Sequence, residues 1–304
     1  MPPRPRDDGL SEVVGFVLLL GVIVVALSLY QVYGVPAAGR ENEIAHMNQV
    51  KDRFVDYKIA LDSLWVNNMD YNRTGVLLST AFDLGTGAPA TGGTAFAFPI
   101  LTPAGSGGTV SVNSSGGASL TIDTGSTNVT IPLGNLTYRS SNRYWVDQTW
   151  TYQMGAVFLS QEGGTTVRVG PSIAIAKTKD DNITLTVAPI SLEGSGTIAG
   201  SGPVRVETRM RRSDQPTLDV ACDQVNLTVT GDTATVRAWE RAFGEVRQRA
   251  KDENVIWLLK PEVSPGNKKV TLTVKPGEGG KVVFLSMYPA NYTVTIHNAA
   301  SLVE

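Results

Sequence analysis

The sequence predicts a mainly β protein: an antiparallel, sandwich-like domain on a long N-terminal transmembrane α-helix, with α+β character in the C-terminal part. Three observations favour this fold class. The first is an uncharged apolar run from Val13 to Val35, and the second is a series of short downstream runs in which apolar and polar residues alternate. The third is the segment from Leu84 to Tyr138, which is rich in Gly, Ser and Thr and has Asp123 as its only charged residue. Together they predict strands joined by glycine-rich turns behind a membrane span.

The apolar run sets the expected topology. At about 1.5 Å per helical residue it reaches roughly 35 Å, which is enough to cross the hydrocarbon core of a bilayer. We therefore expect a leader-like segment at 1–9 and a transmembrane helix at 10–35. Arg4 and Arg6 precede the run and favour a single-pass protein of the cell membrane, with a cytoplasmic N-terminus and an extracellular remainder.

A cleaved secretion signal is the alternative interpretation of the same run. Val35-Pro36-Ala37 has small residues at the two positions that a signal peptidase reads. The run is nevertheless longer than the roughly 7–15 apolar residues usual for such a signal, and proline is awkward inside the recognition triplet. A retained helix is therefore favoured.

A second, amphipathic helix is expected at 36–67, outside the membrane. Pro36 at its start either kinks the junction between the two helices or ends the first one. Apolar residues then recur at steps of three and four, which places them on one helix face: Met47, Val50, Phe54, Tyr57, Leu61 and Leu64. We expect this stripe to pack on the chain's own globular domain; a seam with another subunit is the alternative, because the spacing also suits a coiled coil.

Two β-rich domains are expected beyond this helix, at 68–212 and 213–304, with the boundary where the alternating pattern breaks at Arg211 to Pro216. Alternating runs predict strands at 109–112, 120–122, 166–169, 173–176, 183–187, 204–210, 218–220, 225–229, 255–259, 270–274, 282–287 and 292–296. The second domain contains one inserted helix, whose apolar positions are Val236, Trp239, Phe243, Val246 and Ala250. Asp232 or Thr233 is its expected cap.

Composition favours an external location and excludes some classes of protein. The net charge of -2 gives no reason to expect a nucleic-acid partner. Cys222 is the only cysteine, so a scaffold stapled by intrachain disulfides is excluded. Seven Asn-x-Ser/Thr triplets are candidate glycosylation acceptors: Asn72, Asn113, Asn128, Asn135, Asn182, Asn226 and Asn291.

The residue types needed for catalysis do not form a recognisable pattern. His46 and His297 are far apart in the sequence, and Cys222 lies in a predicted strand where it packs as a small apolar group. Gly277 to Lys281 lacks the spacing and the following Ser or Thr of a phosphate loop, and Asp180 to Asn182 lacks the alternating ligands of a calcium loop. Both segments are expected to be turns. We therefore expect a protein that is not an enzyme and has no catalytic, cofactor or metal site.

Aromatic residues cluster in one further segment, which includes Trp145, Trp150 and Tyr152. Aromatic platforms can hold sugars, so a carbohydrate site is one interpretation. The favoured interpretation is a set of strands whose aromatic side chains face a core.

The N-terminal boundary carries the most specific motif. In Gly9-Leu10-Ser11-Glu12-Val13-Val14-Gly15-Phe16, a small residue ends the polar leader and a carboxylate stands just inside the apolar run. This motif resembles the class III signal sequence of archaeal type IV pilins, archaellins and related surface proteins. The resemblance covers about 30 residues, and it departs from the family at Asp8, where a basic residue is common, and in the position of Glu12.

The resemblance implies processing and assembly. A prepilin-type peptidase would cut between Gly9 and Leu10 on the cytoplasmic side, and the mature helix would begin at Leu10. Glu12 would then act in assembly by neutralising the new α-amino group of a neighbouring subunit. The implied partners are membrane lipid, the peptidase, and copies of the chain or other pilin-like subunits.

The leading hypothesis is thus a pilin-like or membrane-anchored archaeal cell-surface protein with a structural or adhesive role. Its helix serves anchoring or filament assembly, and its β domains are displayed outside the cell. A non-polymerising single-pass surface glycoprotein is the main alternative. A carbohydrate-active ectodomain enzyme is a third hypothesis.

Overall fold

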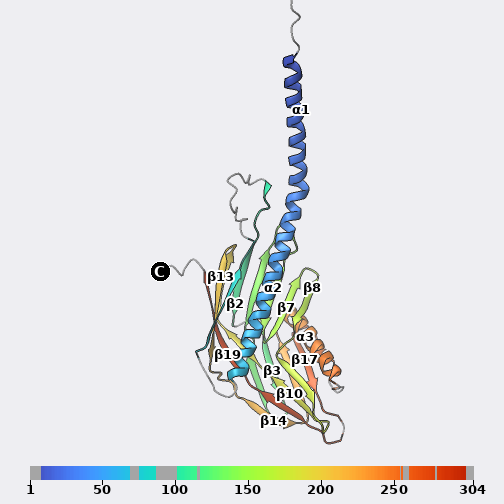
Figure 1. Cartoon of the computed structure of the whole chain (residues 1–304). Helices are drawn as coiled ribbons and strands as arrows, with labels where there is room; N and C mark the ends of the chain where they lie inside the picture. Colours follow the sequence, from blue (N-terminus) through green and yellow to red (C-terminus); the bar gives the residue numbers. More distant parts are fainter. Residues whose placement is uncertain are drawn as a thin grey trace, which may run out of the picture.

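The computed structural model describes residues 8–68, 75–86, 101–114, 117–253, 255, 260–277 and 279–298. A long helix projects from one end of a β-rich part, which we call the head (Figure 1). The prediction of a mainly β protein with a long N-terminal helix is confirmed. Residues 1–7, the acceptor Asn72 and most of the strand expected at 255–259 lie outside the described residues.

The N-terminal helix is continuous through three segments: α1 (Asp8–Leu29), a π-helical turn η1 (Tyr30–Gly34) and α2 (Val35–Asn68). Pro36 does not end the helix, and the π-turn explains why. Proline has no N–H to donate and its ring crowds the carbonyl four residues earlier, so a regular α-turn cannot pass through it without distortion. In η1 the backbone hydrogen bonds join residues five apart and not four apart: the N–H of Val35 donates to the carbonyl oxygen of Tyr30. The chain therefore passes Pro36 as one rod.

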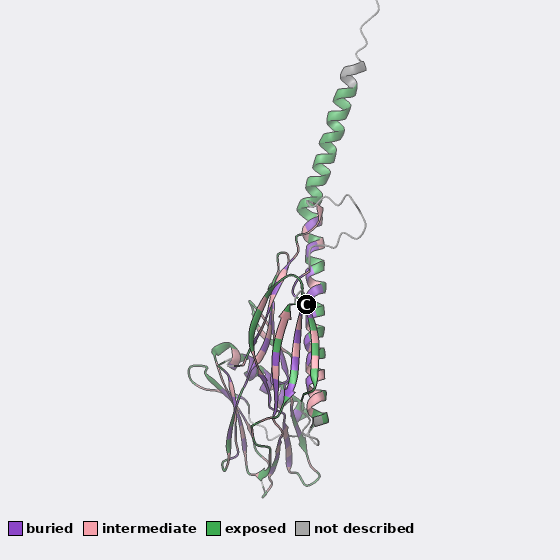
Figure 2. Cartoon of the chain, turned by 90° about the vertical axis from the view of Figure 1, so that its left-hand side faces the viewer, coloured by how far each residue is buried: buried purple, intermediate pink, exposed green. Residues whose placement is uncertain are grey.

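The stripe predicted on the second helix packs against the head. Phe54, Tyr57 and Leu61 are fully or almost fully buried, as are Met47 and Val50. Figure 2 shows buried positions along α2 and exposed positions along the whole described length of α1. The expectation that the stripe packs on the chain's own domain is confirmed, and the stripe is not free to form a seam with another subunit.

Strands of the described residues pair into four sheets. One sheet has the order β1 (Leu77–Asp83), β13 (Pro203–Arg211), β19 (Ala290–Asn298), β11 (Ile190–Glu193). Another has the order β12 (Ser195–Gly200), β2 (Gly107–Asn113), β5 (Asn135–Ser141), β6 (Thr149–Gln153), β7 (Ala156–Gln161), β8 (Gly164–Val169).

The remaining two sheets contact the helix α3 (Thr233–Asp252). One has the order β14 (Leu218–Cys222), β18 (Val283–Met287), β10 (Ile183–Val187), β9 (Ile173–Lys177). The other has the order β16 (Glu262–Val263), β17 (Lys269–Val274), β15 (Val225–Thr230), β3 (Ser119–Asp123), β4 (Asn128–Pro132). Most pairings are antiparallel, as expected, but β10 with β18 and β11 with β19 are parallel.

Two hydrophobic cores hold the head together. The α2 core contains the α2 stripe together with residues such as Phe82, Tyr152 and Tyr292. The α3 core lies under the helix α3 (Thr233–Asp252) and contains Trp239 among its buried residues. Strand β7 belongs to both, because Ala156 and Phe158 join the α3 core while Val157 and Leu159 join the α2 core. A strand buried on both faces reads as a continuous apolar run rather than an alternating one.

The expected boundary between residues 212 and 213 does not separate two structural units. Strand β19 pairs with β13 across it, and β15 pairs with β3 across it. Both cores also contain residues from either side of the boundary. The break in alternation at Arg211 to Pro216 marks the connection between β13 and β14, since strands far apart in the sequence pair side by side in this head.

Helix α3 begins where the sequence predicts. Asp232 is the N-cap, and its carboxylate accepts a hydrogen bond of 2.7 Å from the N–H of Thr235. Hydrogen bonding by the side chain of Thr235, together with that by its N–H, lowers the pKa of Asp232 below its usual range. The basic residues Arg249 and Lys251 occupy the last turn, where the helix dipole favours positive charge.

Replacing the cap, Asp232→Ala, should lower the free energy of unfolding by about 1 kcal/mol, because an N–H in the first turn of α3 loses its acceptor. The carboxylate's contribution should be complete above the ordinary aspartate range and should disappear as the pH falls through the lowered pKa. Denaturant unfolding of the full-length protein in detergent micelles at pH 7 and at pH 3 would measure both effects. Asp232→Asn, which keeps an acceptor oxygen, is the matched control, and a loss equal to that of alanine would contradict the capping role.

Candidate functional site

The surface of α1 is the most unusual feature of the molecule. Each described side chain from Glu12 to Tyr33 is exposed, and nearly all of them are apolar. Soluble proteins rarely expose a continuous apolar surface of this size. Among the described residues, one helical stretch, Glu12–Asn67, is long and apolar enough to contain a membrane span, as judged by length and composition.

The residues predicted for processing and assembly lie at the start of this helix. Gly9 and Leu10 belong to the first turn of α1, and their exposure to solvent is outside the described part. Glu12 follows and is exposed. A carboxylate near a helix N-terminus is favoured by the dipole, so the position of Glu12 fits either an ordinary structural role or the assembly role. Cleavage after Gly9 stays a prediction.

The junction between α1 and the head contains a buried carboxylate. Glu43 on α2 is 1% exposed and accepts three backbone hydrogen bonds from the turn between β5 and β6. The donors are the N–H groups of Arg143 at 2.7 Å, Tyr144 at 2.8 Å and Trp145 at 2.7 Å. Hydrogen bonds to a charged acceptor are stronger than neutral ones. Glu43 therefore attaches the turn to the helix just where the helix leaves the head.

Neighbouring residues of α2 fit the same turn. The guanidinium carbon of Arg40 lies 4.4 Å from the ring centroid of Trp145, which is a cation–π contact. A side chain at Gly39 would place its Cβ 2.3 Å from the ring of Tyr144, so only glycine allows this approach. We call Gly39, Arg40 and Glu43, with the turn 143–145 that they hold, the junction clamp.

Sequence reasoning missed the junction clamp. The one local signal in the sequence was helical spacing, which places Gly39, Arg40 and Glu43 on the same side of α2. Their partners lie about 100 residues further along the chain, and nothing local predicts that pairing. The structure also places the aromatic cluster: Trp150 and Tyr152 are buried core residues, as the favoured interpretation expects, whereas Trp145 is partly exposed at the junction.

The two histidines have separate partners. His46 is 5% exposed, and its Nε2 lies 2.9 Å from the carbonyl oxygen of Asp83. The Nε2 of His297 lies 3.4 Å from a carboxylate oxygen of Glu207. Burial raises the pKa of the Cys222 thiol, which disfavours the reactive thiolate. No group of three or more His, Cys, Asp or Glu side chains suited to a metal ion occurs among the described residues.

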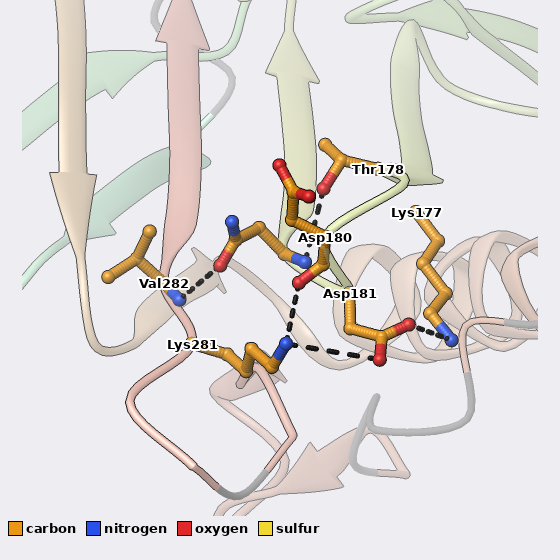
Figure 3. Close-up of polar contacts among 7 residues, drawn as sticks. Lys177, Thr178, Asp180, Asp181, Lys281 and Val282 are labelled. Atoms are coloured by element: carbon orange, nitrogen blue, oxygen red, sulfur yellow. Dashed lines mark hydrogen bonds and ion pairs between the residues drawn. The ribbon is translucent and has the colours of Figure 1, made fainter.

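The segment from Asp180 to Asn182 is a hairpin turn, as predicted (Figure 3). Asp181 adopts a left-handed conformation with φ of 63°, and its carboxylate pairs with Lys177 at 2.7 Å. The hydrogen bond from Lys177 is the main reason that the pKa of Asp181 is lowered. Lys281 donates to the carbonyl of Asp180 at 2.6 Å and so joins this turn to the chain preceding β18. Lys177 and Lys281 both lie near the carboxylate of Asp181, and Lys281 also holds the backbone of the turn, so the turn is a structural contact.

The glycosylation candidates differ in accessibility. Asn113 and Asn128 are exposed at strand ends, while Asn135, Asn182 and Asn226 are partly buried. Asn291 is 9% exposed, and its amide nitrogen donates to Glu193 at 3.4 Å. Asn113 and Asn128 are therefore the most accessible acceptors in the part of the chain that the structure describes.

The fold and the exposed helix define a class of protein in which a long apolar N-terminal helix projects from a β-rich head. The chain belongs to a family described as "Family of unknown function (DUF7289)", whose model matches residues 104–275. The matched range lies within the head and excludes α1 and α2. No curated protein and no solved structure matches the chain significantly.

Proposed function

We propose that this chain is a membrane-anchored, pilin-like archaeal cell-surface protein with a structural or adhesive role. One observation carries the proposal: a single continuous helix is apolar and uncovered over α1, and is held in the head over α2. Membrane lipid or the helices of other pilin-like subunits would cover the α1 surface. The junction clamp supports this function, because it transmits the orientation of the helix to the head.

The topology follows from the same helix. The N-terminus is cytoplasmic and the head is extracellular, since Arg4 and Arg6 precede the span. A prepilin-type peptidase cuts between Gly9 and Leu10, and Glu12 receives the new α-amino group of a neighbouring subunit. We propose a sandwich-like arrangement for the displayed head, with its two packed cores as the supporting observation.

The mature N-terminus tests the proposal. We expect N-terminal sequencing of the protein purified from membranes to begin at Leu10. Gly9→Trp should leave Met1 in place, because the bulky residue blocks the cut, whereas Gly15→Trp should still be processed. An intact Met1 in the unmodified protein, or a product that begins at Ala38, would refute the pilin-like version.

A second candidate function is a single-pass surface glycoprotein that does not polymerise. The observation that favours it is the burial of the α2 stripe within the chain's own head, which removes one surface for contact between subunits. This candidate predicts monomers after detergent extraction and glycan on accessible acceptors such as Asn113 or Asn128. Surface filaments that contain the chain and disappear in Gly9→Trp would rule it out.

A further inference from the structure

A cavity of about 330 Å³ lies at the end of α2 that is remote from α1. Trp65 of α2 and Tyr288 of the β18–β19 turn form part of its wall, and Arg211, Arg212 and Gln215 form another part. Its volume is in the range of small-ligand sites. The cavity is separate from the junction clamp, because the clamp residues and Trp65 are at opposite ends of α2.

The aromatic wall of this cavity is fixed. The indole Nε1 of Trp65 donates to the carbonyl oxygen of Tyr288 at 2.7 Å, which satisfies the only polar group of the ring. Beneath the wall, Met210 and Ala290 are each 3% exposed and give the cavity an apolar floor. A ligand therefore meets an ordered aromatic and apolar surface.

A second cavity of about 350 Å³ meets the first one at Arg211 and lies on the other face of β13 from Met210. It lies over β1, β13 and β19 and is lined by residues that include Arg209, Thr293 and Thr295. Arg211 lines both cavities. The hydroxyl oxygen of Thr293 is buried without a hydrogen-bond partner among the described residues. Because Arg211 is the last residue of β13, an extended ligand that passes round the end of this strand could occupy both cavities.

The charge along the two cavities is positive. Glu207 is neutralised by Arg205, at 2.7 Å, and Glu193 lies 3.6 Å from Arg211. Arg209 and Arg212 are exposed and make no ion pair among the residues that the structure describes. Two unpaired guanidinium groups at exposed positions favour anionic groups, to which guanidinium donates in a planar, bidentate manner.

We propose that these two cavities form a binding groove for an acidic polysaccharide, a chain of sugars that carry carboxylate groups. The fixed aromatic wall suits a sugar face, the amide and hydroxyl groups of the lining suit its hydroxyls, and the arginines suit its acid groups. The shared Arg211 suits a linear polymer longer than one sugar. This inference deepens the proposed adhesive role, on which it rests only for the display of the groove outside the cell.

Binding by the purified full-length protein in detergent micelles tests the groove independently of processing, anchoring or assembly. The probe is alginate, a polyuronate; dextran is the neutral sugar control, and polyglutamate is the control for an acidic polymer without sugars. We expect calorimetry to show alginate binding that weakens as salt is raised, and no dextran binding. Polyglutamate should bind at least 10-fold more weakly than alginate.

Arginine variants locate the binding. Arg209→Ala and Arg212→Ala should each weaken alginate binding by about 5-fold, as expected for the loss of one solvent-exposed charged contact. Arg168→Ala, which removes an exposed arginine from β8 outside the groove, should not change it. The thermal transition of each variant verifies that the head remains folded.

Three results would overturn the proposal. Absence of alginate binding by the folded protein would show that the groove does not take a polyuronate. Equal binding of polyglutamate would show that the surface recognises charge and not sugar. An equal effect of Arg168→Ala would show attraction by the whole head. Each of these results leaves the test of the mature N-terminus, and hence the anchoring function, unaffected.

Discussion

Replacing Trp239 by alanine is expected to lower the free energy of unfolding by about 3–5 kcal/mol, the usual cost of removing a large buried aromatic side chain. Trp239 is fully buried on α3, and its ring lies 5.9 Å from that of Phe158 and 5.4 Å from that of Phe243. Its indole N–H donates to the side-chain oxygen of Gln153 at 2.7 Å. The substitution therefore creates a cavity in the α3 core and leaves a buried acceptor unpaired.

Denaturant unfolding of the full-length protein in detergent micelles measures this loss. Trp239→Phe keeps most of the ring volume but removes the N–H, so it separates the hydrogen bond from the packing and should cost about 1–3 kcal/mol. Arg237→Ala, at an exposed position on the same helix, is the surface control. If Trp239→Ala costs no more than Arg237→Ala, then α3 does not pack as described.

The substitution Glu43→Ala is expected to release the turn between β5 and β6 and to cost about 2–4 kcal/mol. Three N–H groups lose one shared, charged acceptor, and hydrogen bonds to charged groups each contribute roughly 1.5–3 kcal/mol. The expected loss is smaller than their sum because the freed turn can reach water, since Arg143 is exposed. The backbone N–H groups of Arg143, Tyr144 and Trp145 should lose more protection from hydrogen exchange than other sites in the protein.

Hydrogen exchange of the full-length protein locates this effect. Exchange at 143–145 should accelerate strongly in Glu43→Ala and partly in Glu43→Gln, whose single carbonyl oxygen replaces two carboxylate oxygens. Glu41→Ala is the matched control, because Glu41 is an exposed glutamate on the same helix. Unchanged protection at 143–145 in Glu43→Ala would mean that the carboxylate does not hold the turn.

The elements predicted with most success are those whose burial follows a simple period. The stripes from Met47 to Leu64 and from Val236 to Ala250 each have one buried face, so spacing alone revealed α2 and α3. Strands such as β2, β3 and β10 alternate buried and less buried residues, and the sequence showed them equally well. Strand β7 was missed because its apolar residues face two cores and do not alternate.

Long-range pairing was beyond local reasoning. A domain boundary was predicted at Arg212 because the alternation of apolar and polar residues stops there. Strand β19, which follows this boundary in the sequence, nevertheless pairs with β13, which precedes it. The same limit applies to the candidate sites. The span and Glu12 were visible in the sequence, whereas Glu43 gains its role from a turn about 100 residues away. The groove arginines were also missed, since Arg211 and Arg212 resemble ordinary loop residues until Trp65 is placed beside them.

The π-turn at η1 has a consequence for how the head is oriented about the helix axis. In an α-helix each residue advances the direction of its side chain by about 100°. One residue more than an α-turn needs is accommodated between Tyr30 and Val35. The angular phase of α1 relative to the head therefore lags by about one residue behind that of an unbroken α-helix. Pro36 thus sets a rotational register: it determines which side of the head lies in line with a given side of α1.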